Sequence, residues 1–527
     1  MARGSERRTA ILLTAFIGLV TGVATAQVGA GLWRIGVAGE WQWAYYASPA
    51  HWSLLGPVLV SGAVLVGLAA YGLVRRAPSR LFITGLLIAM VLAALGLYTC
   101  IDELGPLGSV REEAYVTVAP WVGGYYLESL RVGSLPEFLA TYDDYIAPIP
   151  VNDKFLGHIS DHPPGPVVLH VLLNRLLGGL PPLAELFYPG EAMHRDIERN
   201  LARRPLARHE VAGVGAAAML FRLLAALTLV PVYLLGRAAY SHRTGMMAAG
   251  LSALIPALHV FGPYVDQVQP VMAVTVLWLF WRSTQSRRGG WAWSVAAGVV
   301  LFLGLQITLA FLTLVFTMGV AAGLMLAGQL HGRKRDGAEG KPPTAEDRPP
   351  APGELFTHWG SLALAGALGV LVPALASFLI LDYDVVSVWW ICFSKHATFA
   401  ETFHRTYWKW TLFGPVEVAL FVGLPVGCLA LWRVGRRGWG WISGVARRRP
   451  MDVFLWALFA TAVALNVSGK NLGEVARLWM FLMPPVAVVA AAELDTQERP
   501  VGGFITVAGL TLFQAVVFCA VLNVFSA

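Results

Sequence analysis

The chain has 527 residues, of which 56% are hydrophobic and 13% charged, with a formal net charge of +7 at pH 7. A mean hydropathy of +0.61 excludes an ordinary soluble globular protein. The basic excess does not indicate nucleic acid binding, because the basic residues form short clusters between long apolar segments. Such clusters mark the cytoplasmic side of a membrane protein, so the sequence predicts a polytopic helical membrane protein.

The predicted fold is all-α, with about thirteen transmembrane helices in one integral membrane domain, residues 1–527. Three apolar segments precede residue 101, and Arg3, Arg7 and Arg8 place the N-terminus in the cytoplasm. The long apolar stretch after Trp291 requires a break, which we expect at Gly304-Leu305-Gln306. The later predicted helices are 212–236, 246–264, 267–283, 291–304, 307–328, 358–380, 412–432, 452–468, 476–493 and 503–525.

Residues 101–211 are predicted to form one external region that carries juxtamembrane helices. Within it, Pro166–Leu180 is too short to cross comfortably, and a crossing there would put the later basic clusters on the external side. Residues 331–355 are rich in Pro, Gly and charge, which predicts a disordered cytoplasmic linker. An aromatic, basic external loop is expected from Asp382 to Trp410. We expect the plasma (inner) membrane as the location, with the active site on the external face.

Carboxylates and cations gather in the segments predicted to be external. A transfer reaction at this face needs a base to activate an acceptor hydroxyl and cations to hold an anionic leaving group. The candidate catalytic acids are Glu113, Asp161 and Asp266, and the candidate substrate-binding residues are His162, Lys395, His396, Arg405, Lys409, Glu474 and Arg477. At least one of the four cations in this set is expected close to His162. The apolar bundle beside them is a candidate site for a prenyl chain.

Each candidate also has a purely structural explanation. Loop charges are most often just solvated, and the basic segment Lys395–Lys409 would then contact lipid headgroups. Arg477 would pair with Glu474 one turn earlier, and Arg222, inside an apolar helix, with an acid or the interface. Asp266 lies between two apolar runs, where a carboxylate is costly unless it is paired or functional. This position favours a functional role for Asp266.

Three motifs resemble the GT-C class of polyprenyl-phosphate-dependent glycosyltransferases, in particular its protein O-mannosyltransferase and lipid A aminoarabinose transferase branch. Asp161-His162-Pro163-Pro164-Gly165 resembles the His/Lys-Pro-Pro motif that ends the first external loop of that class. Phe221-Arg222-Leu223-Leu224, followed by Tyr233-Leu234-Leu235-Gly236-Arg237, resembles the helix that comes next. Tyr264-Val265-Asp266 resembles the short loop with a second important aspartate. The resemblance covers about Cys100 to Arg288 and implies an all-α membrane fold with an external site.

The chain departs from this class at the family's Asp-Glu pair. The comparable aromatic helix here begins at Trp121 and has no acid in the expected position. Asp102-Glu103 and Glu112-Glu113 are both open as replacements. The four cysteines show no metal-ligand spacing. A divalent metal ion as cofactor is still left open, because Asp161 with His162, or Glu112 with Glu113, could position one.

The sequence therefore predicts a membrane glycosyltransferase that passes a sugar from a polyprenyl-phosphate donor to a lipid, glycan or protein acceptor outside the cytoplasm. One alternative is a non-enzymatic transporter or flippase of lipid-linked sugars, which would favour polar residues and broken helices at mid-membrane. The predicted polar residues lie at one face instead. A second alternative, an inactive member of the class, rests on the missing Asp-Glu pair.

Overall fold

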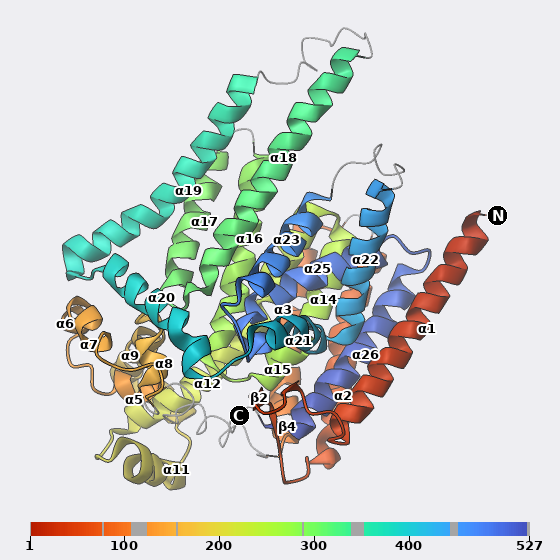
Figure 1. Cartoon of the computed structure of the whole chain (residues 1–527). Coiled ribbons are helices and arrows are strands. Elements are labelled where there is room, and N and C mark those ends of the chain that lie inside the picture. The colour runs from red at the N-terminus through yellow and green to blue at the C-terminus, as the bar shows by residue number, and fades with distance from the viewer. Residues whose placement is uncertain are drawn as a thin grey trace.

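A computed structural model describes residues 2–75, 78–106, 124–153, 156–286, 289–338, 352–442 and 452–523. Helices dominate the described chain, and the strands are limited to short pairs. By length and composition, seven helical segments of the described chain are long and apolar enough to cross a membrane. The protein is an all-α polytopic membrane protein, as predicted (Figure 1).

The membrane-length segments are single helices or pairs that run on with little bend. They are α1 (Ala2–Gly29), α2 (Leu55–Val74) after the short η1 (Trp52–Leu54), α3 (Arg80–Leu104), α12 (Arg208–Leu227) continued by α13 (Leu229–Ala239), α18 (Leu312–Ala338) after η5 (Leu309–Phe311), α19 (Pro352–Leu381) and α26 (Pro500–Val521). Their apolar side chains need a nonpolar surrounding, and their backbone groups are satisfied within each helix, as a bilayer requires.

Two further apolar helix pairs are bent by 119°. They are α9 (Gly165–Gly179) with α10 (Pro181–Phe187), and α21 (Tyr407–Val422) with α22 (Leu424–Ile442). Counting each bent pair as one span raises the total in the described ranges to nine. The predicted number of about thirteen is therefore not confirmed. Shorter apolar helices are α17 (Gly290–Leu305), α23 (Val453–Ser468) and η7 (Met480–Leu482) with α25 (Met483–Leu494).

The remaining helices are short or lie inside the bundle. Those inside it are α14 (His242–Ser252), α15 (Pro256–Val260), η4 (Val265–Gln267) and α16 (Val268–Gln285). Those at one end are α5 (Tyr125–Ser129), α6 (Leu135–Ala140), α7 (Tyr142–Ile146), α8 (Gly157–Ser160), α11 (Glu191–Asp196), η3 (Ile197–Ala202), α20 (Val385–Thr402) and α24 (Val475–Leu478). Strands β1 (Gly36–Val37) and β2 (Trp41–Gln42) pair antiparallel, and β3 (Ala44–Tyr45) pairs with β4 (Leu522–Asn523).

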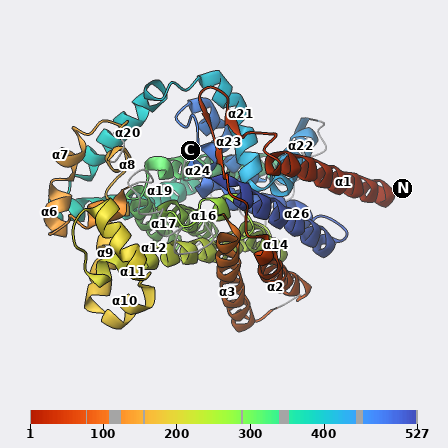
Figure 2. The ribbon, with the colours of Figure 1, turned by 90° about the horizontal axis from the view of Figure 1, so that it is seen from below.

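The short helices gather at the lower end of the bundle, where β2 and β4 also lie (Figure 1). The N-terminus and the far ends of α18 and α19 lie at the opposite end. Seen from below, α20 runs beside α7 and α8 (Figure 2). The structure thus separates the segment predicted to be external from the ends predicted to be cytoplasmic.

Several predicted boundaries were wrong. Asp382–Trp410 is not a loop, because α20 and the first turn of α21 occupy most of it. The predicted single helix 412–432 is the bent pair α21–α22. The predicted helix 246–264 is two short helices, since Pro256 starts α15. The predicted linker 331–355 overlaps the ends of α18 and α19, and its residues 339–351 lie outside the described chain.

Candidate functional site

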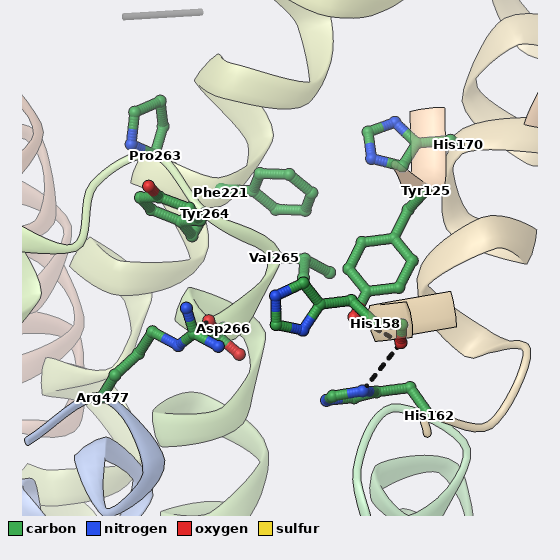
Figure 3. Close-up of a pocket in the computed structure, with 10 residues that line it drawn as sticks. All are labelled: Tyr125, His158, His162, His170, Phe221, Pro263, Tyr264, Val265, Asp266 and Arg477. Atoms are coloured by element: carbon green, nitrogen blue, oxygen red, sulfur yellow. Dashed lines mark hydrogen bonds and ion pairs between the residues drawn. The ribbon is translucent and has the colours of Figure 1, made fainter. Parts of the chain in front are cut away.

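A small cavity lies where the short helices meet the bundle (Figure 3). Its lining comes from α5, α8, α9, α12, the turn before α16 and α24. The residues are Tyr125, His158, His162, His170, Phe221, Pro263, Tyr264, Val265, Asp266 and Arg477. Its volume is about 20 Å³, enough for one or two water molecules. Residues far apart in the sequence therefore converge on one polar space.

Asp161, which is buried, and His162, which is half-buried, form a pair at this cavity. His162 Nδ1 lies 2.6 Å from Asp161 Oδ1 and 3.0 Å from the carbonyl oxygen of His158. The Tyr142 hydroxyl donates to the carbonyl oxygens of Ile159 and His162, at 3.0 Å each, which fixes the turn. Because Nδ1 is occupied, Nε2 is the ring nitrogen that His162 can offer to a ligand.

The turn that carries this pair is locked onto the bundle at Gly165. The Gly165 N–H donates to the carbonyl oxygen of Gln306 over 2.8 Å. A Cβ atom at this position would lie 2.2 Å from the same oxygen, so only glycine fits. Gln306 follows α17 directly, in the predicted break of the long apolar stretch, and its side chain accepts a hydrogen bond from Tyr383. The break after α17 therefore provides the carbonyl group that holds the Asp161–Gly165 turn in place.

The surroundings push the four ionisable groups here in different directions. Burial raises the pKa of Asp161, but the charges of His162 and His158 and the bond to His162 outweigh it and lower the pKa to about 2. Burial alone would lower the pKa of His162, but Asp161 raises it above its ordinary value. For His158 and His396, burial dominates and lowers the pKa. At neutral pH His162 is thus the best placed of the three imidazoles to hold a proton.

Asp266 and Arg477 form the other wall, and Glu474 is bonded to Arg477. Arg477 Nη1 lies 3.0 Å from Glu474 Oε2, and its Nε lies 3.6 Å from Asp266 Oδ2. The Gln269 amide donates to Asp266 Oδ1 over 2.7 Å. Burial would lower the pKa of Arg477, but Glu474 and Asp266 raise it further, so the guanidinium stays charged. Glu474 holds a left-handed backbone (φ 49°), a strained conformation for a residue with a side chain.

The remaining predicted residues of the described chain do not line the cavity. The His396 ring, on α20, is 6.1 Å from the His162 ring. Lys395 Nζ donates to the carbonyl oxygens of Ile146 and Ile149, at 2.5 and 2.6 Å. Lys409 Nζ lies 2.9 Å from Glu40. The guanidinium carbon of Arg405 lies 5.6 Å from the ring centres of Trp41 and Trp410.

Thus His162, Asp266 and Arg477 meet at one cavity, with Asp161 and Glu474 bonded to its walls. Glu113 lies outside the described residues. Asp102, one proposed replacement for the Asp-Glu pair, is buried in an ion pair with Arg222. An acidic partner was one of the two expectations for Arg222, which lies inside an apolar helix. Sequence reasoning missed His158 and His170. The available signal was the position of His158 four residues before His162, and in the structure the two rings lie 6.5 Å apart.

No three His, Cys, Asp or Glu side chains of the described chain are arranged to hold a metal ion.

No protein family model and no curated protein matches the chain. Among solved structures it is similar to the Archaeoglobus fulgidus oligosaccharyltransferase complexed with zinc and sulfate (16% identity, 79% of this chain, 53% of that chain, TM-score 0.38). The apo form of that enzyme matches at 13% identity, 82% and 56% coverage and TM-score 0.42. The Archaeoglobus fulgidus oligosaccharyltransferase AglB, in complex with an inhibitory peptide and a dolichol-phosphate, matches at 14% identity. That match covers 82% of this chain and 56% of that chain, with a TM-score of 0.39.

The chain thus spans about half the length of the structures it matches. At TM-scores below 0.5, this likeness decides neither the fold family nor the activity. The argument for function therefore rests on the residues of this chain.

Proposed function

We propose that this protein is a membrane glycosyltransferase of the GT-C class. It would take a sugar from a polyprenyl-phosphate donor and pass it to a lipid, glycan or protein acceptor on the external face of the plasma membrane. The observation that carries the proposal is the convergence of Asp266, Arg477 and the Asp161–His162 pair on one cavity at the end of an apolar bundle. The motif resemblance supports the same class.

The proposed step is a displacement at the anomeric carbon of the donor sugar. Asp266 accepts the proton of the acceptor hydroxyl, whose oxygen forms the new bond to that carbon. The bond from the carbon to the phosphate oxygen breaks, and the electron pair leaves with the phosphate. Arg477 balances the charge of Asp266 from 3.6 Å. His162, held by Asp161, presents an N–H to a sugar or phosphate oxygen.

The test replaces Asp266 by asparagine, which keeps the size of the side chain and removes the base. We expect Asp266→Asn to lower transfer by roughly a hundredfold or more with unchanged expression and thermal unfolding. The measurement is transfer of radiolabelled sugar from a polyprenyl-phosphate donor to a membrane extract, catalysed by the full chain in nanodiscs.

Asp144→Asn is the matched control, because Asp144 is an exposed acid of α7 outside the cavity lining. It should transfer sugar at the wild-type rate. Full activity of Asp266→Asn would mean that Asp266 is structural. A wild-type protein that moves lipid-linked sugars across vesicles without transferring them would favour the transporter alternative.

A further inference from the structure

The two oxygens of the Asp266 carboxylate have different surroundings. Oδ1 accepts a hydrogen bond from the side-chain amide of Gln269 over 2.7 Å. Oδ2 lies 3.6 Å from Nε of Arg477, which is longer than a hydrogen bond. The contact with Gln269 is therefore the one that can fix how the carboxylate is turned.

Arg477 leaves this gap because it is bonded elsewhere. Its Nη1 lies 3.0 Å from Oε2 of Glu474. Its Nε is buried and has no hydrogen-bond acceptor among the residues that the structure describes. An ion pair without a hydrogen bond attracts the carboxylate but does not set its orientation. Arg477 thus balances the charge of Asp266 and leaves the lone pairs of Oδ2 to a ligand.

Gln269 is itself firmly held. It is 5% exposed and lies in the first turn of α16, directly before Pro270. Its neighbour Gln267 is also buried and donates to the carbonyl oxygen of Leu258 over 2.8 Å, which ties the start of α16 to α15. Gln269 does not line the cavity, whereas Asp266 does (Figure 3). The amide therefore supports Asp266 from behind.

The carbonyl half of the Gln269 amide has no comparable contact. Its Oε1 is buried, and within the described chain no group donates a hydrogen bond to it. A buried polar atom without a partner lowers stability. The opposite orientation of the amide would set Oε1 against Oδ1 of Asp266. The N–H contact to Asp266 is thus kept despite a loss of stability, which is typical of residues that serve a site.

We propose that Gln269 is a positioning residue of the transfer reaction. It holds Oδ1 of Asp266, so that Oδ2 is the oxygen that accepts the proton of the acceptor hydroxyl. The inference rests on the proposed function and deepens it. A carboxylate turns readily about its Cβ–Cγ bond, because that torsion has a broad energy well. A general base, however, needs one oxygen within hydrogen-bond reach of the proton.

The assignment leaves the balance of the step complete. The proton moves from the acceptor hydroxyl to Oδ2, and the hydroxyl oxygen bonds to the anomeric carbon. The phosphate leaves with the electron pair of its broken bond. Gln269 keeps its own N–H throughout, so it exchanges no proton and acts only through Asp266.

The test measures steady-state transfer by the full chain in nanodiscs, with a radiolabelled polyprenyl-phosphate-linked sugar varied in concentration and a membrane extract as acceptor. Gln269→Met and Gln269→Leu keep most of the side-chain volume and remove the amide. Each should lower kcat about ten- to a hundredfold, because the base is no longer held in place. The KM for the donor and the unfolding temperature should not change. Gln285→Met is the matched control and should have the wild-type kcat, because Gln285 is exposed at the other end of α16, where its amide donates to the Ala238 carbonyl.

The outcomes separate this inference from the proposed function. Wild-type kcat in a folded Gln269 variant, with Asp266→Asn inactive, contradicts the role of Gln269 alone. A raised KM at wild-type kcat would make Gln269 a substrate-binding residue and would overturn the inference. Earlier unfolding of both Gln269 variants, with activity lost only in proportion, would show that the amide is structural. An active Asp266→Asn contradicts the proposed function and this inference together.

Discussion

Ionisable side chains around the cavity have different partners, and these partners decide what each can do. Asp161 and His162 are bonded to each other, while Arg477 is divided between two carboxylates. His158 and His396 face the same region, but burial lowers the pKa of each. The proton held by His162 is therefore the part of the site most sensitive to pH near neutrality.

The free energy of unfolding should depend on pH through the proton held by His162. The pKa of His162 is raised above 6.5, so its contribution is fully present below pH 6.5 and is lost as the pH rises through the raised pKa. Asp161 has a lowered pKa, so its contribution to stability is fully present above pH 3.8. That contribution is lost only as the pH falls through about 2. We expect wild type to lose stability as the pH rises from 6.5 through the raised pKa of His162.

Thermal unfolding across this pH range checks the prediction. His162→Gln should not show the loss, because it has no proton to release. His396→Gln is the control and should follow wild type, since a lowered pKa leaves His396 neutral over the whole range. Parallel curves for wild type and His162→Gln would show that the pair is not charged.

Sequence reasoning reached some of these residues and not their contacts. His162, Asp266 and Arg477 stood out because each is a polar residue beside a motif or at the end of an apolar run. Lys395 was predicted as a substrate-binding residue, and in the structure its nitrogen donates to the carbonyl oxygens of Ile146 and Ile149. A one-dimensional pattern identifies a charge but cannot show which backbone groups, far along the chain, already use it.

At the scale of elements, hydropathy predicted where long helices run and failed where they bend. The break at Gly304–Gln306 was correct, since a helix as long as the apolar stretch would exceed the bilayer. The bend between α21 and α22 was missed, because hydropathy is continuous across it. Gly423 makes the bend with φ 92°, which a side chain would resist. The aromatic and basic helix α20 was taken for a loop for lack of an uninterrupted apolar run.

Helix α24 carries Arg477 and is too short to be stable alone, so its position depends on a tertiary contact. That contact is Glu417 of α21, which is fully buried. Its Oε1 accepts from the Trp43 indole over 3.0 Å and from the Ala476 N–H over 3.2 Å. Among the residues that the structure describes, none donates a hydrogen bond to its Oε2. The Glu417 carboxylate therefore connects three parts of the chain, which are α21 itself, Trp43 after β2, and α24.

We expect Glu417→Leu to destabilise the protein by about 2 kcal/mol or more, because two buried donors lose their acceptor. Glu417→Gln should be neutral or stabilising, since its amide oxygen can still accept and no unpaired oxygen charge is buried. Thermal unfolding in one detergent gives the order. A glutamine variant as unstable as the leucine variant would mean that the negative charge itself, and not the acceptor, holds α24.

For the whole molecule, the fold distributes polar chemistry unevenly along the bundle. The cavity depends on the short helices and turns at the lower end (Figure 1). The other end holds a different set of charges, in which Arg433 pairs with Asp452 over 2.6 Å and with Glu493 over 3.4 Å. These contacts join α22, α23 and α25 and satisfy one another, as expected of a structural clasp. The proposed catalytic groups lie at one end of the bundle and this ion-pair cluster lies at the other. Such a separation suits the proposed enzyme, which would act on one side of a membrane.

This arrangement predicts the orientation of the chain in the bilayer. Arg195 is exposed on α11, and Arg335 lies near the end of α18 that points away from it (Figure 1). If residues 101–211 are external and Pro166–Leu180 does not cross, the basic clusters around Arg335 face the cytoplasm, where the positive-inside rule places them. A membrane-impermeant thiol reagent added to intact cells should then modify Arg195→Cys and leave Arg335→Cys unmodified until the membrane is opened. Both changes belong in a chain whose four native cysteines are replaced by alanine, because all four are free thiols. Labelling of position 335 alone would invert the protein and move the proposed site to the cytoplasmic face.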